Sequence, residues 1–247
     1  MILKGSQLCE QVETSVKLVV SEDITGTNGN ASVGSQMSNL CIKCSTVAQG
    51  FLVWALERSS KSEFPSTAHY PYTAPGILSL VRIIISHHPL QRVSTIELAM
   101  NFIGHSCSEL SYQRLNAIKE QAVRLLLIIA TKGLAIDVFN AVTSKVKSGR
   151  STFDSRLIRY FMSGLLDIMR PPFSLGIVQS MGSLLLLSPC TEALNAVYFD
   201  SNKKQKLRTF IGYFSDVVSD EHKAFARFTS RDQSICAALK SAYKLAS

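Results

Sequence analysis

The stretch Ser155-Arg-Leu-Ile-Arg-Tyr-Phe-Met-Ser-Gly-Leu-Leu-Asp-Ile-Met-Arg-Pro-Pro-Phe173 decides the fold. Its apolar residues recur at spacings of three and four, which places them on one side of an α-helix. The segment Ser151-Thr-Phe-Asp154 is typical of a helix start with an acidic residue in the first turn. Pro171 and Pro172 should end the helix, because proline has no amide hydrogen to continue it. The apolar face consists of Leu157, Ile158, Phe161, Leu165 and Ile168.

Helical patterns continue on both sides of this stretch, and no segment shows a sustained alternation of period two that would predict a strand. Short polar or proline-bearing segments separate them, and Gly133 is suited to a left-handed helix stop. We expect polar loops at residues 21–35 and 59–75. The expected helices are Leu3–Val20, Met37–Leu56, Ile77–Ser86, Pro89–Gly104, Ser108–Thr131, Ala135–Lys147, Arg156–Met169 and Pro172–Leu187, followed by Ser188-Pro189 as another helix start and by apolar stripes at 207–218 and 235–245.

These elements predict an all-α fold of stacked antiparallel helix pairs, since helices joined by short turns usually pack against their neighbours. No clean repeat of fixed period is visible, so a HEAT-like α-solenoid and an irregular helical bundle both stay open. We expect an N-terminal helix and flexible loop at 1–36, a helical-repeat scaffold domain at 37–218, and a C-terminal helical tail at 219–247.

Composition narrows the class of protein. The 247 residues carry a formal net charge of +8 and are 46% hydrophobic, as in an ordinary globular protein. The start of the chain has no apolar signal region, and the most apolar run, Ala122–Phe139, is interrupted by charged residues, so we expect no membrane span. Six scattered cysteines favour a reducing compartment, the cytosol or the nucleus.

Motifs for catalysis or metal binding are weak. Cys41-Ile-Lys-Cys44 has the spacing of half a zinc site, but no second pair follows, so two thiols on a helix is the favoured interpretation. His87 and His88 stand at a helix end, where imidazoles can satisfy free carbonyl groups. No phosphate-binding glycine loop or nucleophile motif is present. We therefore predict no catalytic residue, no metal ligand and no cofactor, and expect the chain not to be an enzyme.

Two basic clusters are candidate nucleic-acid contacts, because phosphate binding requires lysine or arginine gathered on one face. The alternative is that these residues have no binding role and lie on solvated helix faces beside aromatic core residues. The first cluster, which includes Arg159, surrounds one helix–helix connection, and the second precedes the Phe210–Phe214 stripe. The candidate residues are Lys145, Lys147, Arg150, Arg156, Lys203, Lys204, Lys206 and Arg208.

The deciding stretch also resembles a known family. The order Leu157-Ile-Arg-Tyr-Phe161, then Leu166-Asp-Ile168, then Pro171-Pro-Phe173 is similar to the C-terminal region of the negative elongation factor C/D family. Three further pieces follow the family's order: Phe51-Leu-Val-Trp54, His88-Pro89 and Phe210-Ile-Gly-Tyr-Phe214.

The resemblance covers Cys41 to Phe214, and the segment after Ser215 has no counterpart in the family. Family members are much longer, so we expect this chain to be either a fragment or a divergent short homologue that lacks the partner-binding N-terminal region. From the matching motif, Arg159, Tyr160 and Phe161 carry over as structural residues and Arg156 as a candidate surface contact.

The resemblance implies a non-enzymatic helical-repeat scaffold in a nuclear complex that represses RNA polymerase II elongation near promoters. The implied partners are subunits A and B, the RNA polymerase II elongation complex and RNA, with no membrane. The alternative function is a helical-repeat protein that binds RNA or single-stranded nucleic acid directly through its basic patches.

Overall fold

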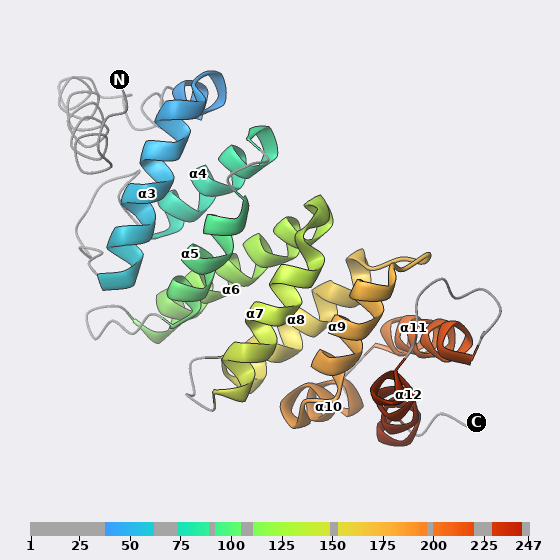
Figure 1. The fold of residues 1–247 in the computed structure, drawn as a ribbon. Coiled ribbons are helices and arrows are strands. Elements are labelled where there is room, and N and C mark those ends of the chain that lie inside the picture. Colours follow the sequence, from blue (N-terminus) through green and yellow to red (C-terminus); the bar gives the residue numbers. More distant parts are fainter. Residues whose placement is uncertain are drawn as a thin grey trace, which may run out of the picture. The chain divides into compact units, whose positions relative to one another are not determined.

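The computed structural model describes residues 38–61, 74–88, 92–104, 111–148, 153–196, 200–219 and 229–243. Every regular element in these ranges is a helix, so the expected all-α class is confirmed (Figure 1). The chain divides into two compact units, the N-terminal unit (Met1–Ile129) and the C-terminal unit (Ala130–Ser247). The expected helix Leu3–Val20 and the loop at 21–35 lie outside the described residues, and the solenoid and the boundaries at 36 and 218 stay predictions.

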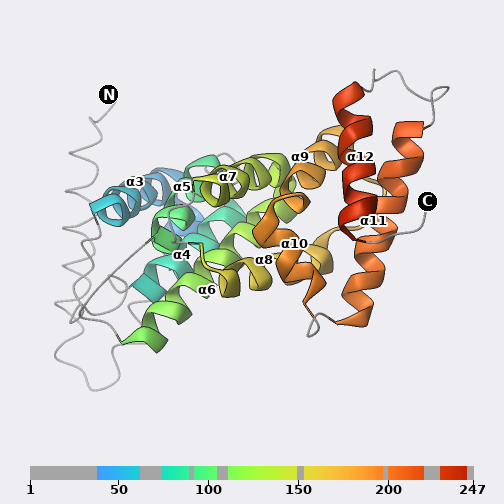
Figure 2. The ribbon, with the colours of Figure 1, turned by 90° about the horizontal axis from the view of Figure 1, so that it is seen from below.

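Helices α3 to α6 form the described part of the N-terminal unit. Helix α5 packs against both α3 and α6, and α4 packs against α6; Figure 2 shows α3, α4 and α5 side by side. The core between them is apolar, with Phe51, Ile77, Ile84, Phe102 and Leu126 almost fully buried. The bounds are α3 Ser45–Lys61, α4 Ala74–His87, α5 Arg92–Gly104 and α6 Tyr112–Ile129, and a short helical segment at 38–43 precedes α3.

Helix α3 begins later than the predicted helix Met37–Leu56, after a break at Cys44, and extends past its predicted end to residues that we expected in a loop. The hydroxyl of Ser59 donates to the Leu56 carbonyl at 2.8 Å, and that of Ser60 donates to the Glu57 carbonyl at 2.7 Å. These bonds satisfy the serine hydroxyls within the helix, so polar residues did not end it here. Ser59 is buried and also accepts a hydrogen bond of 3.1 Å from the Asn101 side chain of α5.

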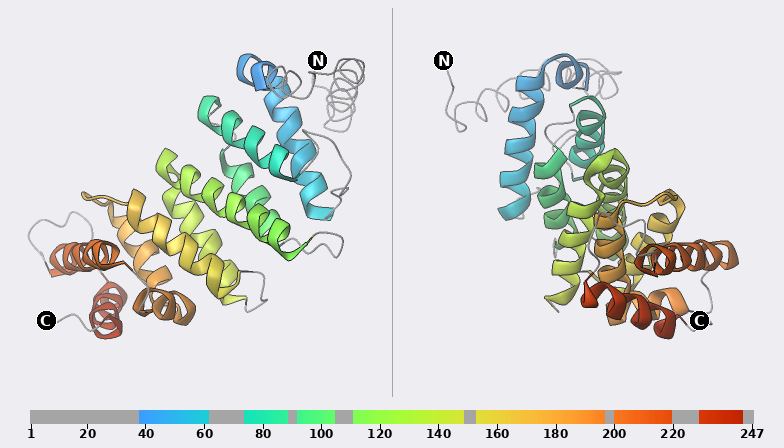
Figure 3. Two further views of the ribbon diagram at one scale, coloured as in Figure 1. Left: turned by 180° about the vertical axis from the view of Figure 1, so that it is seen from behind. Right: turned by 45° about the vertical axis from the view of Figure 1, so that its right-hand side comes forward.

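The C-terminal unit contains a short π-helical segment and six α-helices in its described residues. Helix α9 packs on α7, α10 on α8, and α11 on both α8 and α12; α11 and α12 lie side by side in both views of Figure 3. Gly133 has a φ of 97°, as expected for a left-handed stop, and separates α7 from the preceding helix. The bounds are η2 Ala130–Leu134, α7 Ala135–Lys147, α8 Ser155–Ile168, α9 Leu175–Leu185, α10 Ser188–Asn195, α11 Ser201–Ser219 and α12 Ser230–Ala242.

Helix α8 confirms the interpretation of the deciding stretch, because Leu157, Phe161 and Leu165 are at most 1% exposed. The start differs in detail from the prediction. Asp154 is itself the N-cap, and its carboxylate accepts a hydrogen bond of 2.8 Å from the Leu157 amide. A carboxylate at this position satisfies an amide that has no partner inside the helix, so Asp154 precedes the first turn and does not lie within it as predicted.

By length and mean hydropathy alone, the helical run Tyr112–Lys147 would suffice to cross a membrane. The core helix of a soluble protein passes the same test, and one such run is weak evidence. Helix α6 buries Ile118, Val123 and Leu126 within the N-terminal unit, which accounts for its apolar composition.

Candidate functional site

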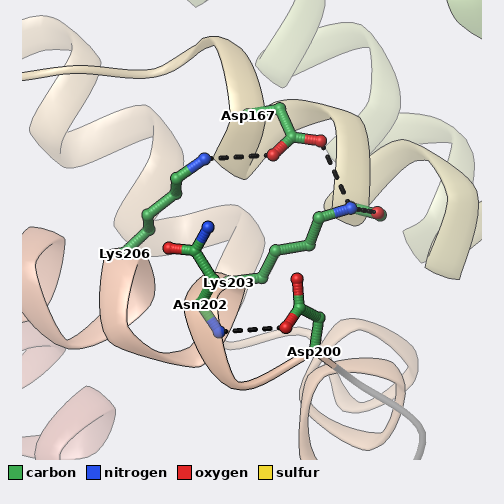
Figure 4. A network of polar contacts seen from close by, with 6 residues as sticks. Asp167, Asp200, Asn202, Lys203 and Lys206 are labelled. Atoms are coloured by element: carbon green, nitrogen blue, oxygen red, sulfur yellow. Dashed lines mark hydrogen bonds and ion pairs between the residues drawn. The ribbon is translucent and has the colours of Figure 1, made fainter.

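The structure turns two candidate residues of α11 toward a single carboxylate of α8. Lys203 Nζ lies 3.2 Å from Asp167 Oδ2, and Lys206 Nζ lies 3.1 Å from Asp167 Oδ1, as Figure 4 shows. Lys203 also donates a hydrogen bond to the Ser163 hydroxyl. Because residues three apart lie on one side of a helix, both lysines can reach the same acceptor. We call Asp167, Lys203 and Lys206 the α8–α11 charge cluster.

The charge of Asp167 is maintained by its two partners. Partial burial alone would raise the pKa of this carboxyl, but the hydrogen bonds and positive charges of Lys206 and Lys203 outweigh it, so the pKa lies below its ordinary value. Asp167 is therefore ionised at neutral pH and offsets one of the two positive charges. The cluster keeps one net positive charge for an outside ligand.

The other two candidates on α11 lie away from this pair. Lys204 is half-buried, and Arg208, one helical turn further on, is exposed. Residues four apart share a side of the helix, so these two side chains can contribute to one surface. The four basic residues are clustered in the sequence, but the structure divides them into two pairs. Lys203 and Lys206 contact Asp167, and Lys204 and Arg208 form the other pair.

The first basic cluster is also dispersed. Lys145 and Lys147 lie in the last turn of α7, where positive charge interacts favourably with the negative end of the helix. On α8, the Nε and Nη2 atoms of Arg156 are buried, so much of this guanidinium is turned into the protein. Arg159 is exposed and its Nε donates to the Ser155 carbonyl at 3.3 Å. Arg150 lies outside the described residues.

Cys41 and His88 have surroundings that favour a structural role over metal binding or catalysis. Burial, with a smaller contribution from neighbouring Cys44, raises the pKa of Cys41 to about 12, so its thiol stays protonated and is a poor metal ligand or nucleophile. His88 Nε2 donates to the Cys41 carbonyl oxygen at 2.7 Å, which ties the end of α4 to the 38–43 segment. Within the described ranges, no three His, Cys, Asp or Glu side chains come close enough together to hold a metal ion.

One feature of the N-terminal unit was missed by sequence reasoning. A groove of about 360 Å³ lies between α4 and α6, and Arg82 and Arg124 are among the side chains that line it. A signal was available, because each arginine stands within a run of aliphatic residues, where a charged residue is unexpected. The convergence of the two arginines could not be inferred, since they are far apart in the chain.

Comparison with known proteins identifies a family and a curated relative that this chain resembles. The model of the family described as TH1 protein matches residues 9–232. The match extends past both ends of the expected range Cys41–Phe214, so the expectation that the segment after Ser215 has no counterpart in the family is wrong as far as residue 232. Negative elongation factor D of Mus musculus is 24% identical over 172 residues, which cover 68% of this chain and 27% of that relative. The chain therefore spans about a quarter of the length of this curated relative. No solved structure gives a significant match. The match over most of its length shows that this chain belongs to the TH1 protein family, the family of the negative elongation factor C/D proteins.

Proposed function

We propose that this chain is a non-enzymatic scaffold subunit of a nuclear complex similar to the negative elongation factor, and that it helps to repress RNA polymerase II elongation near promoters by bridging other subunits. The observation that carries the proposal is the family match over residues 9–232 of the 247. A protein of that family, negative elongation factor D, provides the functional analogy.

The described structure supports a binding role rather than a chemical one. The helices bury aliphatic and aromatic side chains, and the polar contacts around α8 and α11 tie helices to one another. Packed helices offer extended surfaces on which protein partners can bind. Of the pair Cys41 and Cys44, the buried Cys41 has an unreactive thiol, because burial raises its pKa.

The alternative is direct binding of RNA by the basic residues. Lys204 and Arg208 favour it, because both lie on α11 one turn apart and Arg208 is exposed. The Asp167 carboxylate and the inward guanidinium atoms of Arg156 weaken it. Strong phosphate binding uses several cations on one face, so we rank the scaffold role first.

Co-expression with subunits A and B of the negative elongation factor tests the proposal. We expect this chain to co-purify with at least one of them through affinity capture and size-exclusion chromatography. The matched control is Lys204→Glu/Arg208→Glu, which should retain the subunit and change only RNA binding. Recovery of neither subunit with a folded chain would overturn the scaffold role.

The same double variant decides the alternative. If the basic residues of α11 bind RNA, the wild-type chain should bind fluorescent oligouridine with an affinity that falls steeply with salt. The variant should then bind several-fold more weakly, and its salt dependence should be shallower. Identical binding curves would reject the RNA role for these residues.

A further inference from the structure

The groove between α4 and α6 has an apolar floor and a basic rim. Leu78 and Leu125 are buried and form part of its lining, whereas Arg82 and Arg124 are exposed. Its volume of about 360 Å³ lies within the range of sites that hold small ligands or single side chains. The groove belongs wholly to the N-terminal unit and is separate from the α8–α11 charge cluster.

The sequence places these side chains through helical spacing. On α4, Leu78, Ser79 and Arg82 are separated by one and three residues, and on α6, Arg124 follows Gln121 by three. Residues three or four apart lie on the same side of a helix. Since α4 packs against α6, the two faces line one hollow and bring an arginine from each helix to it.

The chemistry of the lining favours an anion with an apolar neighbour. A guanidinium group binds a carboxylate through paired hydrogen bonds, so a carboxylate at this rim can contact Arg82 and Arg124. Ser79 and Gln121 have side chains that both donate and accept, which suits the amide groups of a peptide backbone. Leu78 and Leu125 suit an aliphatic side chain.

Nucleic acid fits this lining less well. None of the seven described residues that line the groove is aromatic, so bases would have no ring on which to stack. An apolar floor makes no favourable contact with a nucleic-acid backbone, whose phosphates require a longer row of lysine or arginine side chains. A protein segment can use both the leucines and the arginines.

We propose that this groove binds an acidic segment of a partner protein, with a glutamate or aspartate carboxylate between Arg82 and Arg124 and a neighbouring aliphatic side chain against Leu78 and Leu125. This goes beyond the proposed function, because it holds for any partner with that chemistry, whether or not it belongs to an elongation complex.

The test uses the full chain and a short fluorescent peptide that repeats the Leu-Glu-Glu triplet. We expect saturable binding by fluorescence anisotropy and, in the ¹⁵N-labelled protein, shifts of the Nε–Hε signals of Arg82 and Arg124. A peptide repeating Leu-Gln-Gln should bind at least about tenfold more weakly, because a charge-assisted hydrogen bond is lost at each arginine. Absence of any shift at saturating Leu-Glu-Glu peptide overturns the proposal.

Variants separate this groove from general positive charge. Arg82→Glu and Arg124→Glu should each weaken peptide binding about tenfold or more. The matched control is Arg114→Glu, which makes the same charge change at an exposed position of α6 that does not line the groove, and should leave the affinity unchanged. An equal loss in Arg114→Glu would show that only net charge matters and would overturn the site.

A third arm distinguishes the class of ligand. Fluorescent oligouridine should not shift the Arg82 and Arg124 signals under conditions in which the Leu-Glu-Glu peptide does. If the oligonucleotide shifts both and the peptide shifts neither, the groove is a nucleic-acid site and the protein-segment proposal is wrong. Arg82→Lys adds a check, because it keeps the charge but loses the paired geometry and should retain only part of the affinity.

Discussion

The two units use their charged side chains differently. In the C-terminal unit, the Asp167 carboxylate lies against Lys203 and Lys206, and the buried Asp232 accepts a hydrogen bond of 3.0 Å from Gln179. In the N-terminal unit, the arginines of α4 and α6 line a groove. Asp167 and Asp232 thus link helices of the C-terminal unit, whereas Arg82 and Arg124 line a surface groove of the N-terminal unit.

This difference shows that clustering in sequence is a poor guide to clustering in space. Lys203 and Lys206 stand in the most conspicuous basic run of the chain, yet an acidic residue 39 positions from Lys206 offsets part of their charge. Arg82 and Arg124 are isolated in sequence, yet both line one groove. A basic residue becomes a candidate binding group only through the neighbours that the fold gives it.

The largest expected effect tests whether each unit depends on its own apolar core. Phe161→Ala in α8 and Phe102→Ala in α5 should each lower the free energy of unfolding by about 3–5 kcal/mol, because both rings are 1% exposed and each truncation leaves a cavity. Urea unfolding followed by circular dichroism measures both losses.

The single tryptophan makes this comparison unit-specific. Trp54 is buried in α3 beside Phe51, so its fluorescence reports on the N-terminal unit. Phe102→Ala should shift the fluorescence midpoint in urea, with Val53→Ala, at an exposed position of α3, as a control of small effect. A loss below about 1 kcal/mol for Phe161→Ala would contradict the burial of the α8 face.

A smaller loss of unfolding free energy should follow removal of the buried Asp232 carboxylate and its hydrogen bonds. Asp232 completes a capping box with Thr229 at the start of α12 and also binds Gln179 of α9. Asp232→Ala removes these bonds together and should cost about 2–3 kcal/mol in unfolding free energy. Asp216→Ala, at an exposed position of α11, should cost less than about 0.5 kcal/mol. Equal losses in the two variants would show that the hydrogen bonds of Asp232 do not contribute to stability.

Close approach of helices in the C-terminal unit gives the next prediction. A methyl group at Gly182 of α9 would come within 2.9 Å of Phe214 Cε1 and 3.1 Å of Ile235 Cγ2. Since Phe214 is fully buried, its ring has little room to move, and Gly182→Ala should destabilise the fold by about 1–2 kcal/mol.

Gly212 provides the matched control for this change. It lies in α11, and apart from its chain neighbours and the backbone of its own helix nothing lies within 4 Å of the position that a methyl group would take, so Gly212→Ala gains helix propensity without a clash. It should stabilise the protein by about 0.5–1 kcal/mol, measured by the same thermal or urea unfolding. Equal destabilisation by both substitutions would show that the loss at Gly182 does not come from its close approach to Phe214 and Ile235.

Local patterns in the sequence predicted most of the helices. The bounds of α7, Ala135–Lys147, coincide with the prediction, because Gly133 stops one helix and a regular apolar stripe begins the next. The buried face of α8 was likewise readable from spacing alone. Both features depend on residues within a few helical turns of one another.

The candidate site could not be predicted in the same way, because it depends on partners distant in the chain. Nothing in the spacing of Lys203 and Lys206 indicates that Asp167 lies opposite them. The inward turn of Arg156 has no local signal either, since a charged residue usually predicts a solvated position. Sequence reasoning found basic residues but not their surroundings.

The smallest effect concerns the charge cluster that defines the contrast between the units. Asp167 is half exposed, so solvent screens its ion pairs, and Asp167→Asn should cost less than about 1 kcal/mol at neutral pH. Its pKa lies below the ordinary 3.8 in the folded protein, so the contribution is present above that value and is lost as pH falls through the folded-state pKa. The stability difference between wild type and Asp167→Asn should therefore vanish once the pH lies below the folded-state pKa of Asp167, and it should shrink in high salt.

Asp216→Asn removes one negative charge from an exposed position of α11 and serves as the control for net charge. A difference between wild type and Asp167→Asn that persisted in acid would mean that the aspartate acts through shape rather than charge. The same variant sharpens the functional comparison, because removing the carboxylate leaves Lys203 and Lys206 with their full charge. If the basic residues of the C-terminal unit bind RNA, Asp167→Asn should bind oligouridine more tightly than both wild type and Asp216→Asn, whereas equal affinities would assign these lysines to holding α11 on α8.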